Sequence, residues 1–136
     1  MVCSYCGYKT QTINSRPQKR LNAVWRRRKC LACSRTVTTI EQIDYERTWT
    51  VESPDIPGRP FLRDTLLISL HKCLAHRPSA LSDASALTDT IMGRLGGITQ
   101  DGHLTTTAIA TLSHEALQRF DPAAATMYCA YHADVL

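Results

Sequence analysis

The sequence predicts an α+β fold, in which a small antiparallel β module is followed by a mostly helical domain. Four cysteines form two Cys-x-x-Cys pairs, Cys3 with Cys6 and Cys30 with Cys33, with 23 residues between the pairs. From residue 61 onward, apolar residues recur at the spacing of amphipathic helices. Charge divides the chain similarly, because residues 1–47 contain ten Lys and Arg against three Asp and Glu, whereas residues 48–136 contain six against nine. We therefore expect two domains, at 1–46 and 48–136, and a polyanionic partner for the first.

The two cysteine pairs predict one zinc site within residues 3–33. Two residues between paired cysteines allow a tight turn to aim both sulfurs at one point, and two such turns supply the four ligands of a tetrahedral Zn²⁺. Because all four ligands would be sulfur, no position is left for water, and the metal would be structural. A redox pair and an iron–sulfur cluster stay open as alternatives. A disulfide framework would suit a secreted chain, but Met1-Val2-Cys3 reads as a ligand turn and not as an apolar leader, so we expect a cytoplasmic protein.

Three short strands are predicted around this site. Residues 10–14 are rich in β-branched side chains, residues 15–22 form a polar connection that contains a proline, and residues 23–30 lead back to the second cysteine pair. Residues 36–40 leave that pair as the third strand. The expected product is an antiparallel ribbon that zinc stabilises, since it contains few apolar residues.

The run from Arg26 to Lys29 is the sharpest functional feature of the predicted ribbon. In an extended strand its side chains alternate, so both faces of the strand become cationic. Such a run is usually a solvated surface, but like charges repel within a small ribbon, and this favours binding to nucleic acid. Trp25 could stack on a base, but as one of few large apolar groups it is interpreted as an anchor of the ribbon core. The predicted DNA-binding residues are Arg16, Lys19, Arg20, Arg26, Arg27, Arg28, Lys29 and Arg35.

The second domain begins with a polar junction and one strand. Residues 41–47 are polar, Trp49 and Val51 alternate with polar neighbours, and residues 53–60 read as a Pro/Gly loop. Asp101-Gly102 predicts a turn, with a small hairpin between Ile98 and Leu104.

Four helices are predicted after that loop. The first ends before Pro78, the second begins at Ser82 or Asp83 and stops at Gly96-Gly97, Thr107 caps the third, and Asp121-Pro122 begins the fourth. Cys73 and Cys129 are interpreted as buried apolar residues. The predicted buried positions are Leu66, Leu67, Leu70, Cys73 and Leu74 in the first helix, Leu87, Ile91 and Leu95 in the second, Ile109, Leu112, Ala116 and Phe120 in the third, and Ala124, Met127, Tyr128 and Tyr131 in the fourth.

The order of these motifs resembles that of the NrdR family of bacterial repressors. The resemblance rests on Cys3-x-x-Cys6-Gly7, Asn14-Ser15-Arg16-Pro17, Arg26 to Cys33, Thr38 to Glu41, and a helix opened by Pro60-Phe61 that ends in Arg77-Pro78. It implies a zinc ribbon that binds promoter repeats of ribonucleotide reductase operons, joined to an ATP-cone. It also implies a cytoplasmic, nucleoid-associated homo-oligomer whose assembly responds to ATP or dATP.

The sequence departs from the family pattern at several positions. Asn14 stands in place of Asp and Ser34 in place of Gly, and neither change removes a metal ligand. In the second domain, Glu52 stands where the family has Lys or Arg, which disfavours a triphosphate. Arg59 and Arg63 would compensate and are the predicted nucleotide-binding residues. The family's C-terminal Tyr and Arg fall on Ala125 and Met127, so a nucleotide sensor and a simple oligomerisation module both stay open for this domain.

Other function classes have less support in the sequence. We find no nucleophile–base motif, glycine-rich phosphate loop or acidic metal cluster, and the five histidines are scattered, so we do not expect an enzyme. No apolar run approaches the roughly 20 residues that cross a bilayer, so we expect no membrane partner. The alternative function is a zinc-ribbon subunit that docks on RNA polymerase or the ribosome without operator specificity.

Overall fold

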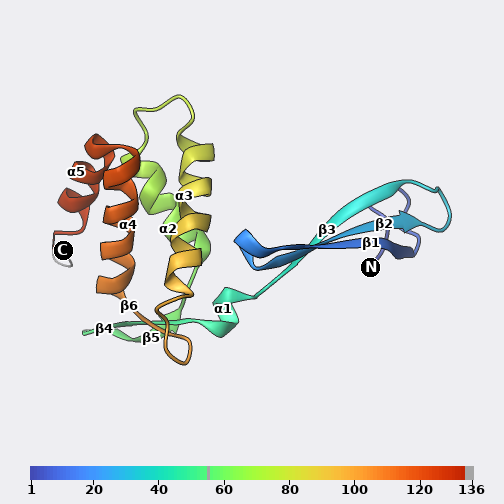
Figure 1. The fold of residues 1–136 in the computed structure, drawn as a ribbon, viewed down its shortest axis with the longest axis horizontal. Helices are drawn as coiled ribbons and strands as arrows, with labels where there is room; N and C mark the ends of the chain where they lie inside the picture. Colours follow the sequence, from blue (N-terminus) through green and yellow to red (C-terminus); the bar gives the residue numbers. More distant parts are fainter. Residues whose placement is uncertain (55, 134–136) are drawn as a thin grey trace. The chain divides into compact units, whose positions relative to one another are not determined.

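A computed structural model describes residues 1–54 and 56–133 of the chain. The chain forms two compact units, Met1–Ile43 and Asp44–Leu136 (Figure 1). The first is an antiparallel β module and the second is mostly helical, which confirms the predicted α+β class. We call the first unit the ribbon and the second the helical unit. Among the described residues, no helix combines the length and apolarity needed to cross a bilayer.

The ribbon is a three-stranded antiparallel sheet in the order β1-β2-β3. Its strands are β1 (Thr10–Gln18), β2 (Ala23–Cys30) and β3 (Thr36–Gln42), and a 3₁₀ turn, η1 (Lys19–Leu21), joins the first two. Strand β1 extends through residues 15–18, where the sequence predicted a connection. Pro17 is tolerated there because β1 lies at the edge of the sheet, where one side of its backbone has no partner strand.

Burial in the ribbon is slight. Its buried apolar residues are Cys3, Ala23 and Cys30. Trp25 is 42% exposed, so its interpretation as a core anchor is wrong. A single three-stranded layer has no second layer within the unit to cover the indole, which therefore faces solvent.

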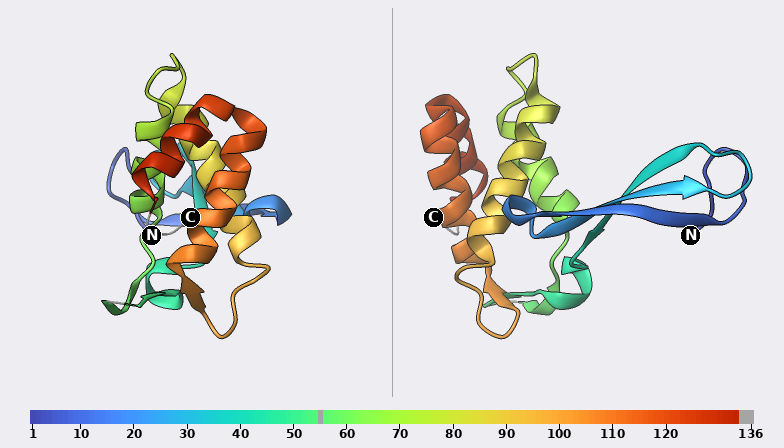
Figure 2. Two further views of the ribbon diagram at one scale, coloured as in Figure 1. Left: turned by 90° about the vertical axis from the view of Figure 1, so that its left-hand side faces the viewer. Right: turned by 45° about the vertical axis from the view of Figure 1, so that its right-hand side comes forward.

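The helical unit combines a small mixed sheet with four longer helices. The helix α1 (Tyr45–Thr48) precedes β4 (Thr50–Ser53) and β5 (Ile56–Pro60), and β6 (His103–Thr105) follows α2 (Arg63–Cys73) and α3 (Ala80–Leu95). The chain ends in α4 (Thr106–Phe120) and α5 (Pro122–Tyr131). The sheet order is β5-β4-β6, with β4 antiparallel to β5 and parallel to β6. Within this unit the four longer helices stand side by side, and the sheet lies at one end of them (Figure 2).

The β elements of the helical unit differ most from the predictions. Residues 56–60 form β5, although their Pro and Gly content predicted a loop. The predicted hairpin between Ile98 and Leu104 is reduced to one antiparallel bridge, Gln100 with His103, and β6 forms its ladder with the distant strand β4. The turn at Asp101-Gly102 is present, and both residues have positive φ.

The helix boundaries follow the predicted caps with two shifts. The helix predicted to begin at Ser82 or Asp83 is α3, which begins at Ala80. Asp121 caps α5 by accepting hydrogen bonds from the backbone N–H groups of Ala123 and Ala124, at 3.1 and 3.2 Å. Thr105, not Thr107, caps α4 by accepting from the Ala108 N–H at 3.1 Å. The predicted stop of α3 at Gly96-Gly97 is confirmed.

One hydrophobic core holds the helical unit together. Trp49 packs against Tyr45 and Phe61, with ring centroids 4.3 and 5.3 Å apart. The helices add Leu66, Leu70, Cys73, Leu74, Ile91, Leu95, Leu117 and Tyr128, among others. Three predicted core residues, Phe120, Met127 and Tyr131, are instead exposed. In α5 the buried residues are Ala124, Ala125 and Tyr128, and the helix contacts α4 and α2.

Candidate metal centre and nucleic-acid interface

The four predicted ligands meet at one end of the ribbon. Their Sγ atoms all lie within 4.8 Å of one another. Cys3 Sγ lies 3.7 Å from Cys33 Sγ, and Cys6 Sγ lies 3.5 Å from Cys30 Sγ. Four sulfurs at a Zn–S distance of about 2.3 Å on a tetrahedron stand about 3.8 Å apart, so the cluster fits a Zn²⁺ ion.

The two ligand turns have matching local geometry. In the first, the Tyr5 backbone N–H donates to Cys3 Sγ, and in the second the Ala32 N–H donates to Cys30 Sγ, both at 3.4 Å. Gly7 at φ +71° and Ser34 at φ +60° turn the chain after each pair. These N–H groups orient the sulfurs and stabilise negative charge on them, as outer-shell donors do in metal sites. Ser34 adopts the left-handed conformation that glycine would adopt at no steric cost.

Two thiols of this cluster, Cys30 and Cys33, differ in pKa. The backbone N–H of Cys33, with that of Ala32, lowers the pKa of the Cys30 thiol to about 6. For Cys33 the Arg35 N–H also acts downward, but desolvation and the neighbouring thiols outweigh it and raise the pKa to about 11. Cys30 therefore becomes a thiolate more readily than Cys33, and a bound cation would displace the proton that Cys33 keeps.

Two of the predicted DNA-binding arginines are engaged within the ribbon. Arg26 donates to Glu41 Oε2 at 2.7 and 2.9 Å and to Ser15 Oγ at 3.0 Å. Arg28 donates to the hydroxyl oxygens of Thr10 and Thr12 at 3.0 and 2.9 Å. The Arg26 guanidinium thus ties β2 to both β1 and β3, and that of Arg28 ties β2 to β1.

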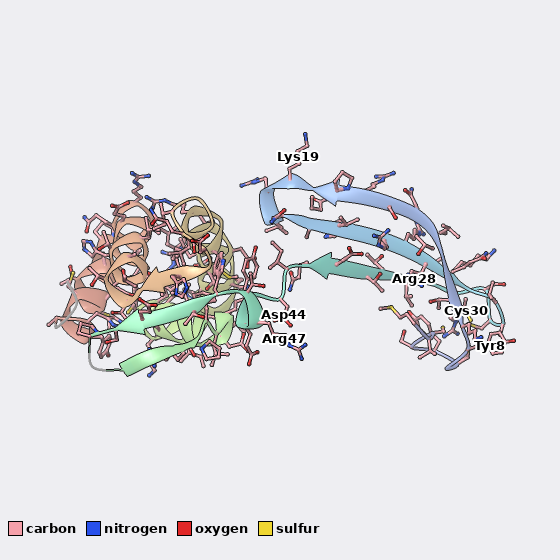
Figure 3. All side chains as sticks on the ribbon, turned by 90° about the horizontal axis from the view of Figure 1, so that it is seen from below. Tyr8, Lys19, Arg28, Cys30, Asp44 and Arg47 are labelled. Atoms are coloured by element: carbon pink, nitrogen blue, oxygen red, sulfur yellow. The ribbon has the colours of Figure 1, made fainter. Side chains whose placement is uncertain are left out.

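The other predicted cations lie in three different settings. Arg16, Arg27 and Lys29 are exposed on the strands. Lys19 and Arg20 lie in η1, and Figure 3 shows Lys19 at the end of the ribbon opposite to Cys30. The Arg35 guanidinium stacks over the Tyr5 ring, 4.6 Å from its centroid, and so lies beside the metal centre.

Comparison with known proteins agrees with this site. Residues 1–41 match the family model described as "Transcriptional repressor NrdR-like, N-terminal domain". A relative named transcriptional repressor NrdR from Symbiobacterium thermophilum is 34% identical over 121 residues, which cover 89% of this chain and 79% of the relative. The chain belongs to the NrdR family. A second relative named NrdR, from Pelotomaculum thermopropionicum, is 32% identical, and the match covers 91% of this chain and 74% of the relative. A third, from Solibacter usitatus, is 29% identical, and the match covers 98% of this chain and 87% of the relative.

Membership in the NrdR family bears on several predictions from the sequence. It confirms the resemblance and the zinc-ribbon character of the N-terminal unit. The relatives are named as transcriptional repressors, which are not enzymes. Roles of individual cations in DNA binding, and any response to nucleotide, stay predictions.

The helical unit of this NrdR-family chain contains a cavity of about 280 Å³. Arg59 lines it, but Arg63 does not approach a ligand freely, because its guanidinium donates to Asp89 at 2.7 Å and to Ser85 at 3.2 Å. The remaining walls are mostly apolar and include Phe61, Leu66, Ile109 and Tyr128. Asp55, which lies between Glu52 and Arg59 in the sequence, is outside the described residues.

Two further polar groups of the cavity were missed from the sequence. His132 and Ser69 both line it, and their Nε2 and Oγ atoms lie 2.9 Å apart. Burial lowers the pKa of His132, so the imidazole is neutral near neutral pH. They lie 63 positions apart, and no local motif marks either residue. Glu52, whose charge is unfavourable to a phosphate, has its Oε1 atom 2.9 Å from His103 Nδ1.

Proposed function

We propose that this chain is a sequence-specific DNA-binding repressor that acts on promoter repeats of ribonucleotide reductase operons, in the cytoplasm on the nucleoid. The observation that carries the proposal is the charge of the ribbon. Residues 1–43 contain nine Lys and Arg and one acidic residue, Glu41, which Arg26 binds. A metal-stabilised module with this excess of exposed cations suits a phosphate backbone. The names of the relatives support repression as the outcome.

Useful specificity requires more than one ribbon. A single small module reads few base pairs, and repeated half-sites read by several copies give the discrimination that a genome demands. The helical unit would supply this assembly as a homo-oligomer. Its exposed apolar side chains, which include Ile68, Met127 and Tyr131, are consistent with such contacts.

An adenine nucleotide is the proposed effector of this assembly. The cavity in the helical unit offers apolar walls for a base and Arg59 for a phosphate. A nucleotide that binds one arrangement of subunits more tightly would change the spacing of the ribbons and thereby the affinity for DNA. Calorimetry with ATP and with dATP at millimolar concentration tests this step. Heat of binding is expected for at least one of them, and its absence from both would leave the helical unit as a scaffold only.

A titration with two duplexes tests DNA recognition. The probes are a duplex from the region upstream of the ribonucleotide reductase genes of the same genome and a scrambled duplex of equal length. The first should bind more tightly, and with about five phosphates neutralised the logarithm of its binding constant should fall with log salt at a slope near −4.5. Equal affinity for both duplexes would contradict specific repression. Co-purification with RNA polymerase or ribosomes after nuclease treatment would favour the docking alternative.

A further inference from the structure

The two faces of the ribbon sheet carry different chemistry. Side chains alternate along β2, and cross-strand partners point to the same side of the sheet. The Arg26 face contains Val24, Arg26 and Arg28 with Pro17, Ser15, Thr12, Glu41, Thr39 and Val37. The Trp25 face contains Trp25, Arg27 and Lys29 with Arg16, Asn14, Gln11, Ile40, Thr38 and Thr36.

The cations of the Arg26 face are already bound. Arg26 is paired with Glu41, and Arg28 is held by Thr10 and Thr12. Both arginines are half-buried. Releasing either of them to a phosphate would cost hydrogen bonds that join β2 to a neighbouring strand. Releasing Arg26 would also leave Glu41 facing the polyanion.

The Trp25 face offers free cations around an apolar centre. Within residues 1–54 and 56–133, no side-chain hydrogen bond or ion pair engages Arg16, Arg27 or Lys29. The face contains no acidic residue, because Glu41 is the only one in residues 1–43 and lies on the other side. Trp25 and Ile40 are cross-strand partners and are 42% and 57% exposed. An exposed apolar pair rimmed by cations marks a binding surface, and its charge selects a nucleic acid.

A β-bulge places Arg16 on this face. The register between β1 and β2 shifts between Thr12 and Asn14, so Thr12 pairs with Arg28 but Arg16 pairs with Trp25. In an unbroken ladder, Arg16 would lie on the same side as Thr10 and Thr12, which is the Arg26 face. The extra residue, Ile13, therefore moves a third cation beside the indole.

We propose that the Trp25 face is the surface of the ribbon that contacts duplex DNA. This inference rests on the proposed function. Arg16, Arg27 and Lys29 bind phosphates, while Trp25 and Ile40 pack against the sugars and base edges between them. Arg26 and Arg28 are positioning residues that keep the strands in register.

Adjacent arginines of β2 provide a matched test. Arg27→Gln and Arg26→Gln each remove one positive charge, at neighbouring positions. The binding of each variant, as the full zinc-loaded chain, to the upstream duplex is measured by titration at several salt concentrations. Arg27→Gln should reduce the magnitude of the salt slope by about 0.9 and weaken binding to both duplexes alike. Arg26→Gln, compared at equal zinc content, should keep the wild-type slope. Equal slope losses, or a loss confined to Arg26→Gln, would overturn the assignment of the face.

Tryptophan fluorescence gives a second test without loss of charge. The chain has two tryptophans, and Trp49 is only 5% exposed, so acrylamide quenching reports mainly on Trp25. Saturating duplex should remove most of this quenching from the wild type, and Trp25→Phe should show little quenching with or without DNA. If the wild type binds the duplex and acrylamide still quenches Trp25 to the same extent, the inference is overturned while the proposed function stays intact. Failure of the wild type to bind either duplex, or preference for a single-stranded RNA of equal length, would overturn both.

Discussion

Two glycines of the helical unit occupy opposite situations. Gly102 has φ +79°, and a Cβ built on it would lie 2.5 Å from the Thr48 carbonyl oxygen. Gly93 lies within helix α3 with open space around it. We expect Gly102→Ala to lower the free energy of unfolding by about 1–3 kcal/mol, because the backbone must shift. Gly93→Ala should raise it by about 0.5–1 kcal/mol, because alanine restricts the unfolded chain.

Denaturant titration of the two variants beside the wild type measures both effects. Each variant adds one methyl group to the same unit, so their opposite signs serve as mutual controls. A stability change of the same sign in both would show that added volume, and not backbone conformation, decides the outcome.

At the scale of single residues, the sequence identified the ligand cysteines but not the roles of the arginines. Cys-x-x-Cys spacing constrains its own geometry, so Cys3, Cys6, Cys30 and Cys33 could be assigned directly. Alternation along β2 also predicted that Arg26 and Arg27 would point to opposite faces. Which face of the sheet carries unpaired cations depends on the position of Glu41 opposite Arg26 and on the bulge at Ile13. The cross-strand register determines both features. The exposure of Trp25 likewise depends on the absence of a covering layer within the ribbon.

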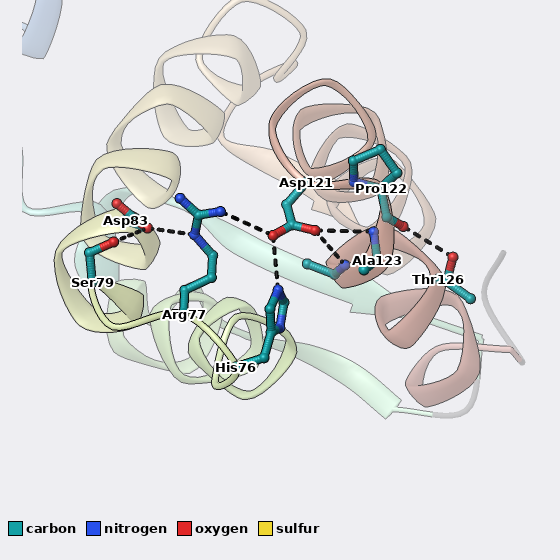
Figure 4. A network of polar contacts seen from close by, with 9 residues as sticks. His76, Arg77, Ser79, Asp83, Asp121, Pro122, Ala123 and Thr126 are labelled. Atoms are coloured by element: carbon teal, nitrogen blue, oxygen red, sulfur yellow. Dashed lines mark hydrogen bonds and ion pairs between the residues drawn. The ribbon is translucent and has the colours of Figure 1, made fainter.

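Among the elements, one ionic network joins the ends of three helices (Figure 4). Arg77, in the connection between α2 and α3, donates to Asp83 of α3 at 2.8 Å and to Asp121, the N-cap of α5, at 3.2 Å. Ser79 donates to Asp83 at 2.6 Å, and His76 Nε2 lies 3.0 Å from Asp121. The network therefore fixes the start of α5 against the start of α3.

The same network predicts a loss of stability in acid. The Ser79 hydroxyl, followed by Arg77, lowers the pKa of Asp83. The Ala124 backbone N–H, followed by His76 and Arg77, lowers that of Asp121. Because both folded-state values lie below the unfolded value of about 3.9, the stabilisation is complete above that pH and is lost as pH falls through the folded values.

Thermal unfolding between pH 6 and pH 2.5 measures this loss. We expect Asp83→Asn to lower the melting temperature at pH 6 and to flatten its decline in acid. Asp64→Asn is the matched control, since Asp64 is exposed on α2 and forms no ion pair within the described residues. Trp49 fluorescence in a Trp25→Phe background restricts the readout to the helical unit. If the melting temperature of Asp83→Asn falls in acid as steeply as that of the wild type, the proposed role of the network is contradicted.

The predictions were correct for helix boundaries, which local sequence signals determine. They were wrong for strands whose formation depends on pairing with distant parts of the chain. The Asp121-Pro122 start and the Gly96-Gly97 stop are local and were predicted correctly. Strand β5 was taken for a loop because Pro57, Gly58 and Pro60 are unfavourable in a central strand, but β5 is an edge strand beside β4. The parallel pairing of β6 with β4 has no local signature, because a long helical connection separates the two strands.

For the whole molecule, charge and cysteine spacing predicted two modules, the first of them stabilised by zinc. The ribbon buries Cys3, Ala23 and Cys30, whereas the helical unit has a continuous core that includes Leu70, Ile91 and many further residues. A module with so little buried apolar area depends on its metal for folding. The helical unit has a hydrophobic core of its own.

Removal of zinc should therefore unfold one unit and spare the other. After treatment with a strong zinc chelator under reducing conditions, we expect the amide NMR signals of residues 1–43 to collapse to random-coil positions and DNA binding to disappear. The helical circular dichroism and the emission of buried Trp49 should persist, because the helical unit keeps its own core.

Cys30→Ser should give the same result without chelator, whereas Cys129→Ser, which changes a cysteine outside the metal cluster, should retain zinc. Loss of the helical signal together with the metal would mean that the two units fold as one, and retention of a dispersed ribbon spectrum would mean that the four sulfurs do not hold it through a metal.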